Sequence, residues 1–338
     1  MSDETEVFEN SEEKDVLLTQ ADAVEEPMAG KGGAGARAIK KKRRTRGDLI
    51  FYCLLLAYPI IQFCIFYVAT KFNAVLYSFQ EIDIANDTVT WTFKNVKKAF
   101  NMLTSSGSLG FAMVNSIKTY FLLLFISTPI SLIFSYYIAK KFPGSGVFRV
   151  ILFLPAIISS VITIAIYTFF VERAFPELMS SLFNVEMLGL LESNDTRYGA
   201  IIFYTIAFGF GSGVLIYANE MSSVPQEVIE SAQLDGSTPI KEFFHIVLPL
   251  IIPTMSTFLI TGMAGIFTNT LGLFLFYGDL APDNVKTIGY DIFVRVRKAS
   301  SEAQYPLISA MGLLLTFVTI TLTMLLRWAL EKLDPNRD

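Results

Sequence analysis

The chain has 338 residues, of which 52% are hydrophobic and only 17% are charged, and its mean hydropathy is +0.49. A soluble globular protein carries about a quarter charged residues, so this composition excludes an ordinary soluble enzyme or binding domain. The net charge of −4 says little about partners, because the acidic excess is concentrated in the N-terminal tail. Apolar runs of about 20 residues instead indicate a polytopic membrane protein.

Residues 1–47 form a tail whose composition differs from the rest. Acidic side chains come first, small residues follow, and a basic cluster at 40–46 ends just before the first apolar run. Such a segment cannot bury a core, so we expect a disordered tail. Basic residues beside a transmembrane segment indicate the cytoplasmic side, which predicts a cytoplasmic N-terminus. The cluster lacks the interleaved aromatic residues of a nucleic-acid site, so no nucleic-acid partner is expected.

Six apolar runs predict an all-α domain with six transmembrane helices over residues 48–330. The second and fifth runs exceed the minimum length, which predicts tilt or kinks. An even number of spans also places a short C-terminal tail, 331–338, in the cytoplasm. The predicted spans are 49–69, 112–139, 148–171, 198–219, 248–277 and 306–329, and the segments expected to face outward are 70–111, 172–197 and 278–305.

The first outward segment is expected to hold an extended stretch at 87–93 and an amphipathic helix over Asn95–Leu103. The long inward segment has the pattern of a helix–turn–helix. Pro225 suits a helix start before Gln226–Leu234, and Asp235-Gly236-Ser237 ends that helix. Thr238-Pro239 then suits the cap and first residue of a second helix. A polar segment of this kind between apolar runs predicts a surface for a soluble partner.

Polar residues inside the spans have two readings, a functional site or a hydrogen bond between helices. Candidates are Asn115, Ser116, Lys118, Thr119, Thr268, Asn269 and Thr270. The glycines at 209–213 suit close helix packing or a thinned wall beside a ligand path. No carboxylate lies at the centre of a predicted span, which argues against an ion-coupled carrier. No catalytic triad, metal motif or nucleotide-binding motif is visible, so no enzyme activity and no metal are expected.

One motif is more specific than these patterns. Glu230, Ala232 and Gly236 are followed after nine residues by Ile246, Leu248 and Pro249, with Ser231 between the first two. This spacing resembles the EAA loop of inner-membrane permeases of ATP-binding-cassette (ABC) importers. The preceding Val224-Pro225 and the pair Asp235-Gly236 resemble the carbohydrate branch, the maltose-type, binding-protein-dependent family.

The resemblance implies a type I ABC importer permease fold with a cytoplasmic coupling helix in the loop 222–249. It also implies a location in the bacterial plasma membrane. The implied partners are two cytoplasmic ATPase subunits, an extracytoplasmic solute-binding protein, and a second permease that is homologous or identical. ATP and Mg²⁺ would be bound by the ATPase, and this chain would need no cofactor. The implied cargo is a sugar or oligosaccharide; a polyol phosphate or a modified sugar is the alternative.

The resemblance also assigns site residues. Those expected to couple to the ATPase are Glu230, Ala232, Asp235, Gly236, Ile246, Leu248 and Pro249. By ungapped counting from the motif, those expected on the substrate path are Phe208, Gly209, Ser212 and Asn269. Ile206, Phe208 and Ile266 are apolar where a sugar favours hydrogen bonds, which leaves open how much of the site this subunit holds. The competing interpretations are an ion-coupled carrier or channel with a chance motif, and a structural subunit without a transport path.

Overall fold

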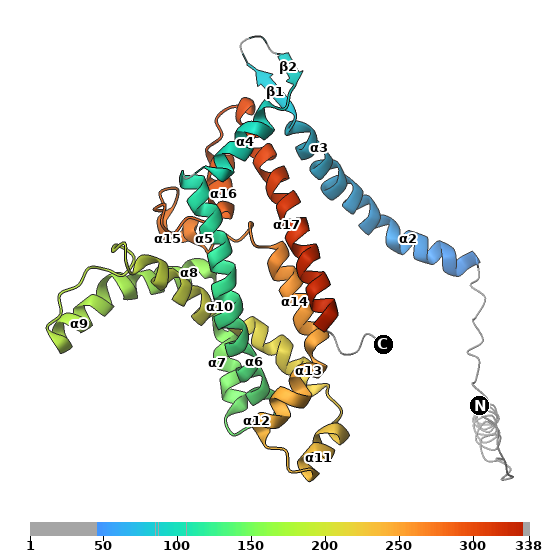
Figure 1. Cartoon of the computed structure of the whole chain (residues 1–338), viewed down its shortest axis with the longest axis vertical. Helices are drawn as coiled ribbons and strands as arrows, with labels where there is room; N and C mark the ends of the chain where they lie inside the picture. The colour runs from blue at the N-terminus through green and yellow to red at the C-terminus, as the bar shows by residue number, and fades with distance from the viewer. Residues whose placement is uncertain (1–45, 85, 87, 106, 334–338) are drawn as a thin grey trace, which may run out of the picture. The chain divides into compact units, whose positions relative to one another are not determined.

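The computed structural model describes residues 46–84, 86, 88–105 and 107–333. The chain divides into two units, Met1–Ile61 and Gln62–Asp338. Nearly all of the predicted N-terminal tail and most of the predicted C-terminal tail lie outside the described residues. Within the described part the secondary structure is almost entirely helical, as predicted, with one short β-hairpin (Figure 1).

The first apolar run forms an unbroken helical stretch made of α2 (Arg46–Phe63), the π-helix η1 (Cys64–Ala69) and α3 (Thr70–Tyr77). It extends beyond the predicted end at residue 69, because no helix-breaking residue occurs before Ser78. The predicted extended stretch is then found as part of a hairpin, β1 (Gln80–Asp83) and β2 (Thr88–Trp91). The predicted amphipathic helix is also confirmed, as α4 (Lys94–Thr104), which buries Ala99 and Leu103.

The second and fourth predicted spans form the centre of the larger unit. The second comprises α5 (Ser108–Leu122), η2 (Leu123–Ser127) and α6 (Thr128–Ala139), and the fourth is α10 (Arg197–Ser222). The two are joined by a buried hydrogen bond from the Ser135 hydroxyl in α6 to the Val214 carbonyl in α10 (2.9 Å). Small residues of this kind allow transmembrane helices to approach closely.

The third predicted span, 148–171, is wrong as a single straight helix. α7 (Ser145–Ile157) ends where Ile158 and Ser159 adopt extended ψ angles, and the chain turns by 99° into the following helices. These are α8 (Ser160–Phe169), η3 (Phe170–Ala174) and α9 (Phe175–Phe183). Pro155 lacks the amide hydrogen that would continue the ladder, which weakens α7 just before the break.

The fifth predicted span, 248–277, is also wrong in extent. The polypeptide runs through α11 (Gln226–Leu234), α12 (Pro239–Glu242), η4 (Phe243–Val247) and α13 (Leu248–Leu250), and bends by 66° before α14 (Ile252–Ala264). The helix stops there, and residues 265–272 are irregular, with positive φ at Leu271 and Gly272. Thr268, Asn269 and Thr270 therefore lie in a loop and not on a helix face. The chain ends with α15 (Leu273–Tyr277), α16 (Ile288–Lys298), η5 (Glu302–Gln304) and α17 (Tyr305–Leu333), the sixth predicted span.

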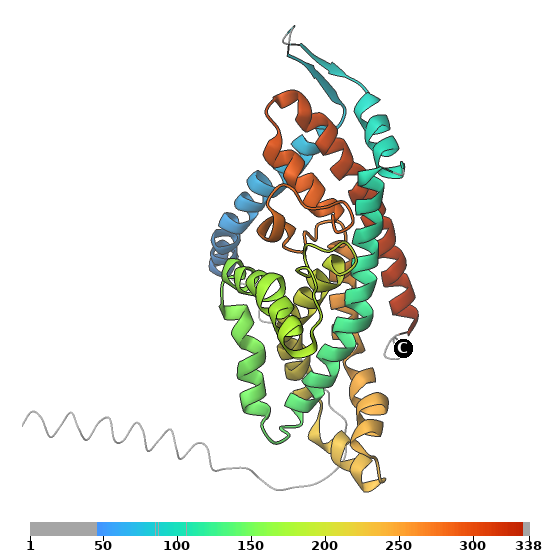
Figure 2. The same ribbon diagram turned by 90° about the vertical axis from the view of Figure 1, so that its left-hand side faces the viewer.

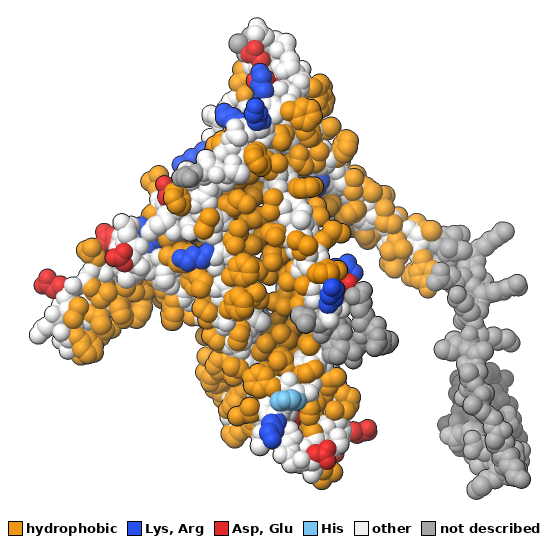
Figure 3. Space-filling view, viewed as in Figure 1, with side chains coloured by type: hydrophobic (Ala, Val, Ile, Leu, Met, Phe, Trp, Pro, Cys, Tyr) orange, Lys and Arg blue, Asp and Glu red, His pale blue; other side chains and the backbone are white. Residues whose placement is uncertain are grey.

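Among the described residues, four helices are long and apolar enough to cross a membrane, and counting each of the two bent pairs as one span gives up to six. Hydrophobic side chains cover much of the surface of the long helices, and many charged ones lie near the hairpin and near α11 (Figure 3). A water-soluble fold would bury such side chains, so this surface fits a lipid environment.

The loops gather into two groups, as a membrane topology requires. The three segments predicted to face outward are joined to one another or to the adjoining end of α5. The two predicted to face inward, 140–147 and 220–247, meet at a separate place. There α11 and α12 lie at the opposite end from the hairpin and α4 (Figures 1 and 2). The first group is linked by the hydrogen bonds Ser108–Asp283 (2.8 Å), Asn115–Lys286 (3.1 Å) and Asn284–Asn194 (3.2 Å). The second is linked by the ion pair between Lys140 and Glu242 (2.5 Å).

Candidate functional site

The predicted helix–turn–helix is present, and we call residues 225–249 the elbow. Its first arm, α11, buries Ile229 and exposes the rest of its length. The turn requires glycine, since Gly236 has φ +78°, and nothing near it would obstruct a side chain. The Ser237 amide donates to the Ala232 carbonyl (3.0 Å), which closes the helix end. Ala232 and Gly236 thus shape the bend itself.

The second arm starts as predicted. The Thr238 hydroxyl accepts from the Lys241 amide (3.4 Å), and Pro239 occupies the first helical position. Val247 is buried together with Phe243 and Ile251 against α6 and α10, and Leu248 packs at the edge of this cluster. Ile246 is half-buried beside them. Pro249 lies at the start of α13, and the bend before α14 follows it.

The outer surface of the elbow combines apolar and acidic side chains. The largest apolar ones near the turn are exposed, with Leu234 at 90%, Ile240 at 72% and Phe244 at 56%. Glu227, Glu230 and Asp235 are also exposed and have no ion pair within the described chain. Apolar side chains exposed beside carboxylates at a turn indicate a surface that binds another protein.

Sequence reasoning missed the residue at the centre of the elbow. Glu242 is 2% exposed, and its Oε1 lies 2.5 Å from the Lys140 Nζ. The contact is an ion pair and not a well-directed hydrogen bond, because Oε1 accepts no hydrogen bond of good geometry. The available signal was the single acidic residue of the second arm, together with a lysine at the start of the first inward segment, 140–147.

An intramembrane cavity of about 330 Å³ lies between α5, α6, α10 and α14. It brings together Gly209 and Asn269, two of the residues predicted on the substrate path. The lining residues of the α5–α6 helix, polar and apolar together, recur at helical spacing, which places them on one face, and further polar lining residues lie on α10. The hydroxyl and amide groups lining it are those of Ser116, Tyr120, Ser127, Thr128, Thr205, Tyr217 and Asn269.

Part of this polar lining is already bonded. Ser116 donates to Ala112 and accepts from the Ile288 amide (2.9 Å), and the Asn269 Oδ1 accepts from the Leu271 amide (2.9 Å). The Asn269 side-chain nitrogen has no partner among the described residues and remains a free donor. No charged side chain from the part of the chain that the structure describes lines the cavity, so this lining suits a neutral, hydroxylated ligand and not an ion.

The other two predicted path residues lie apart from this cavity. Phe208 stacks on Tyr204 with ring centroids 4.8 Å apart, and Ser212 donates to the Gly209 carbonyl of its own helix. Neither lines the cavity. Among the glycines at 209–213, a Cβ at Gly211 would overlap the Leu152 carbonyl oxygen, which confirms close packing there. Gly209 lines the cavity, and a ligand path beside it stays a prediction.

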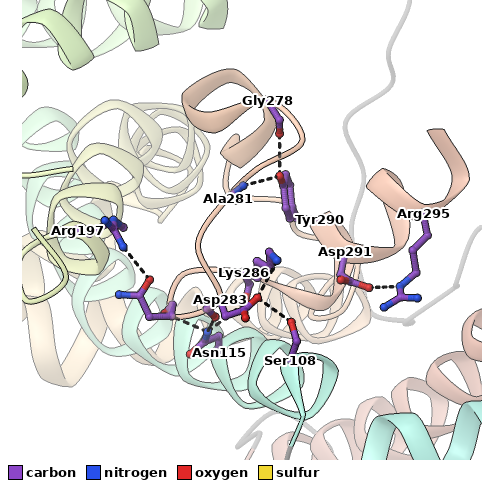
Figure 4. Close-up of polar contacts among 11 residues, drawn as sticks. Ser108, Asn115, Arg197, Gly278, Ala281, Asp283, Lys286, Tyr290, Asp291 and Arg295 are labelled. Carbon is purple, nitrogen blue, oxygen red and sulfur yellow. Dashed lines mark hydrogen bonds and ion pairs between the residues drawn. The ribbon is translucent and has the colours of Figure 1, made fainter. Parts of the chain in front are cut away.

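At the other end of the unit, residues 278–287 form a tightly bonded loop that we call the cap. The Tyr290 hydroxyl donates to the Gly278 carbonyl (2.7 Å) and accepts from the Ala281 amide (3.1 Å), which fixes the loop from inside (Figure 4). Asp283 accepts from Ser108 and pairs with Lys286 (2.7 Å). Hydrogen bonds from Lys286 and Ser108 lower the pKa of Asp283 below its ordinary value.

A buried arginine supports the cap from α10. Arg197 is 9% exposed and donates to the carbonyls of Leu191 (2.7 Å) and Glu192 (2.6 Å) and to the side chains of Asn194 and Asn284. No group of three or more His, Cys, Asp or Glu residues suited to a metal ion occurs in the part of the chain that the structure describes.

Comparison with known proteins identifies the family. Residues 127–338 match the family described as the binding-protein-dependent transport system inner membrane component, and this match covers more than half of the chain. The chain belongs to this family. It is a multi-pass permease subunit of a bacterial inner membrane, not an enzyme, and ATP hydrolysis belongs to a separate subunit. The elbow lies within the matched residues.

Several relatives of this permease are known. It is 23% identical over 84% of its length to the Streptococcus mutans multiple sugar-binding transport system permease protein MsmF, of which 92% is covered. It is 25% identical over 65% of its length to the probable ABC transporter permease protein YesP of Bacillus subtilis, of which 71% is covered. The Escherichia coli maltose/maltodextrin permease protein MalF is 30% identical over 37% of the chain, but that alignment spans only 25% of MalF.

A solved structure has the same fold. A chain of a bacterial ABC transporter involved in the import of the acidic polysaccharide alginate superposes on 85% of this permease with a TM-score of 0.68 and 20% sequence identity, and 96% of that chain is covered. The fold implied by the resemblance is therefore that of the chain: an all-α ABC importer permease.

Proposed function

We propose that this permease imports a neutral sugar or oligosaccharide, that its elbow docks on a cytoplasmic ATPase, and that the Gly209–Asn269 cavity is part of the solute path. The observation that carries this proposal is the elbow itself. It is a bent, solvent-exposed pair of helices whose second arm is buried against the core of the membrane helices. A structural subunit without transport would have no need of such an exposed surface.

The residues of the motif divide into three roles in this proposal. Glu230 and Asp235 are exposed and free to pair with cations of the ATPase, while Ala232 and Gly236 maintain the bend. Ile246, Leu248 and Pro249 join the bend to α14. When the ATPase dimer closes around ATP and Mg²⁺, which it alone would hold, the elbow would transmit this rigid-body motion to the membrane helices.

The proposed cargo follows from the cavity lining. Hydroxyl groups, one free amide donor and aromatic rings can bond a sugar, and the absence of a lining cation disfavours an acidic polysaccharide. The names of MsmF and MalF, which refer to multiple sugars and to maltose, agree with this class. The absence of a lining carboxylate disfavours the ion-coupled carrier that the sequence left open.

The proposed assembly has two ATPase subunits, a second homologous or identical permease, and an extracytoplasmic binding protein. One of the similar structures is of an alginate transporter in complex with its substrate-bound periplasmic protein, which supports the last of these partners. We propose that both termini are cytoplasmic and that the cap faces outward, because this orientation places the elbow on the cytoplasmic side, where it can meet the ATPase.

The docking role can be tested by crosslinking. In a Cys53→Ser, Cys64→Ser background, Leu234→Cys should form a crosslink to the ATPase subunit in native vesicles, because Leu234 is the most exposed apolar side chain of the elbow. Leu280→Cys, equally apolar and 82% exposed but in the cap, is the matched control and should give none. Absence of the Leu234 crosslink would refute the docking role.

The coupling role can be tested by substitution. Gly236→Pro cannot adopt the positive φ of the turn, and Glu230→Lys reverses the charge of the exposed face. Both should abolish ATP-driven uptake of the sugar that the cognate binding protein binds. Both variants should still insert into the membrane. Normal uptake by both variants, or uptake by the purified single chain with an ion gradient and no ATPase, would contradict the proposal.

A further inference from the structure

We infer that Glu242 is a positioning residue of the transport cycle, which locks both arms of the elbow to α6 so that motion of the elbow reaches the wall of the cavity. This inference rests on the proposed function of the elbow. It goes beyond the motif, because neither Glu242 nor its partners belong to the residues that carry the resemblance.

The geometry joins three elements through one carboxylate. Oε1 of Glu242, in α12, lies 2.5 Å from the Nζ of Lys140 at the end of α6. Oε2 accepts a hydrogen bond from the side-chain amide of Gln233 in α11 (3.3 Å). We call these three residues the Glu242 junction.

A second contact reinforces the attachment to α6. The Tyr136 hydroxyl donates to the Pro239 carbonyl (3.0 Å), and the ring packs on Phe243 with centroids 5.0 Å apart. Lys140 follows Tyr136 by four positions, so both lie on the same face of α6. The second arm of the elbow therefore has a fixed position on that face.

Burial makes the junction sensitive to the loss of any member. A carboxylate with 2% exposure is stable as an anion only with charged or hydrogen-bonding partners, and among the described residues Lys140 is the one cation that pairs with it. Lys140 also lies at the C-terminal end of α6, where the helix dipole favours a positive charge. Removal of Lys140 leaves the buried carboxylate uncompensated, and removal of the carboxylate leaves the partly exposed Lys140 without its anion; either change releases the elbow from α6.

The helix held by the junction leads to the cavity. Ser127 and Thr128, where η2 passes into α6, line the same cavity as Gly209 and Asn269. Since α6 runs without a break from Thr128 to Ala139, a displacement of its Lys140 end moves its cavity end as well. The junction thus connects the proposed ATPase-docking surface with the proposed solute path through a single rigid helix.

The first test measures the attachment and needs neither ATPase nor solute. Spin labels at Ser231→Cys in α11 and Ile133→Cys in α6, both exposed, report the distance between elbow and helix in the full chain lacking Cys53 and Cys64. Glu242→Gln and Lys140→Met should each broaden the distance distribution about twofold, and the double variant should be no broader than the worse single one. Lys141→Met, at the adjacent exposed lysine, is the matched control and should leave the width unchanged.

The second test measures coupling in the complex with its ATPase subunits in vesicles. Asn269→Cys, in the Cys53→Ser, Cys64→Ser background, is labelled by a membrane-impermeant maleimide with and without Mg-ATP. In the otherwise unchanged chain, ATP should alter the labelling rate by about tenfold. With Glu242→Gln this change should fall below about twofold, while the ATPase still co-purifies and hydrolyses ATP.

The outcomes separate the two proposals. Unchanged widths in both single variants would overturn the junction, and so would an intact ATP response with Glu242→Gln. Failure of the ATPase to bind even the unsubstituted elbow would refute the proposed function, and the spin-label widths would still decide whether the junction holds the elbow to α6.

Discussion

The elbow and the cap are both loops held to membrane helices by polar contacts, but the contacts are distributed differently. In the elbow they gather on one face of α6, at the buried Glu242 carboxylate and the Pro239 carbonyl, and the outer surface of the loop is left exposed. In the cap they are spread over Ser108, Asn115, Arg197 and Tyr290, which belong to three different helices. A loop that transmits motion needs a free surface and one firm attachment, whereas a loop that must keep its shape benefits from many.

The largest expected effect tests the cap side of this comparison. Arg197→Met removes a buried guanidinium that bonds two carbonyls and two asparagine side chains, so we expect a loss of about 3 kcal/mol of unfolding free energy. Thermal unfolding of the purified protein in detergent measures it. Arg297→Met, which breaks the partly exposed pair with Asp279 and a cation–π contact with Phe274, should cost only about 1 kcal/mol. Equal costs would mean that the cap does not depend on its buried arginine.

A smaller effect is expected where the helix after the cap rests on the irregular loop 265–272. A Cβ at Gly289 would lie 2.8 Å from the Thr268 carbonyl carbon, so Gly289→Ala should destabilise the fold by about 2 kcal/mol through overpacking. Gly312→Ala in α17 meets nothing within 4 Å and should be neutral or slightly stabilising. The same unfolding measurement compares the two, and a neutral Gly289→Ala would show that this contact can relax.

The elbow should respond only locally to loss of the hydroxyl that caps the N-terminus of its second helix. Thr238→Ala removes the hydroxyl that accepts from the Lys241 amide, at a cost of about 1 kcal/mol. Hydrogen exchange should speed up in the second arm of the elbow and remain unchanged in the cap. The neighbouring Ser237→Ala, which removes no helix-capping hydroxyl, is the control. Faster exchange throughout the chain would contradict the idea that the elbow is an independent, singly attached element.

The smallest effect concerns acid. The folded pKa of Asp283 is depressed below its ordinary value of 3.8, so its contribution to cap stability is present above that value and is lost as pH falls through the folded pKa. Hydrogen exchange in the cap should therefore increase slightly as the pH falls from about 5 to about 3. Asp283→Asn should show the loosened cap at neutral pH and lose the pH response. A response that persists in this variant would assign it to another group.

Local patterns predicted a large part of the structure. Hydropathy located the apolar runs, and turn chemistry placed the elbow to the residue, with Pro225, Gly236 and Thr238 in the roles that their backbone and side-chain preferences favour. The same reasoning failed for the third and fifth spans. An apolar composition suits a straight helix and a bent one equally, because the bilayer selects for hydrophobicity and not for continuity.

The candidate site shows the same division. Gly209 and Asn269 were predicted by counting from the motif and do share a cavity, whereas Phe208 and Ser212, one and three residues away from Gly209, do not line it. The direction of a side chain around a helix depends on which neighbours pack there. Tyr204 stacks on Phe208 and holds that ring away from the cavity, which no count along the sequence could indicate.

By itself the sequence determined the class of molecule, the family and the place of the elbow, since hydropathy, glycine backbone freedom and motif spacing act over a few residues. Only the tertiary structure decided what holds the elbow and which polar groups face the cavity. Tyr136 and Pro239 are 103 residues apart in the chain, and Lys140 and Glu242 meet only because the same two helices pack together. Burial then makes that single pairing energetically decisive, because an ion pair away from water depends on its partner and not on its neighbours in sequence.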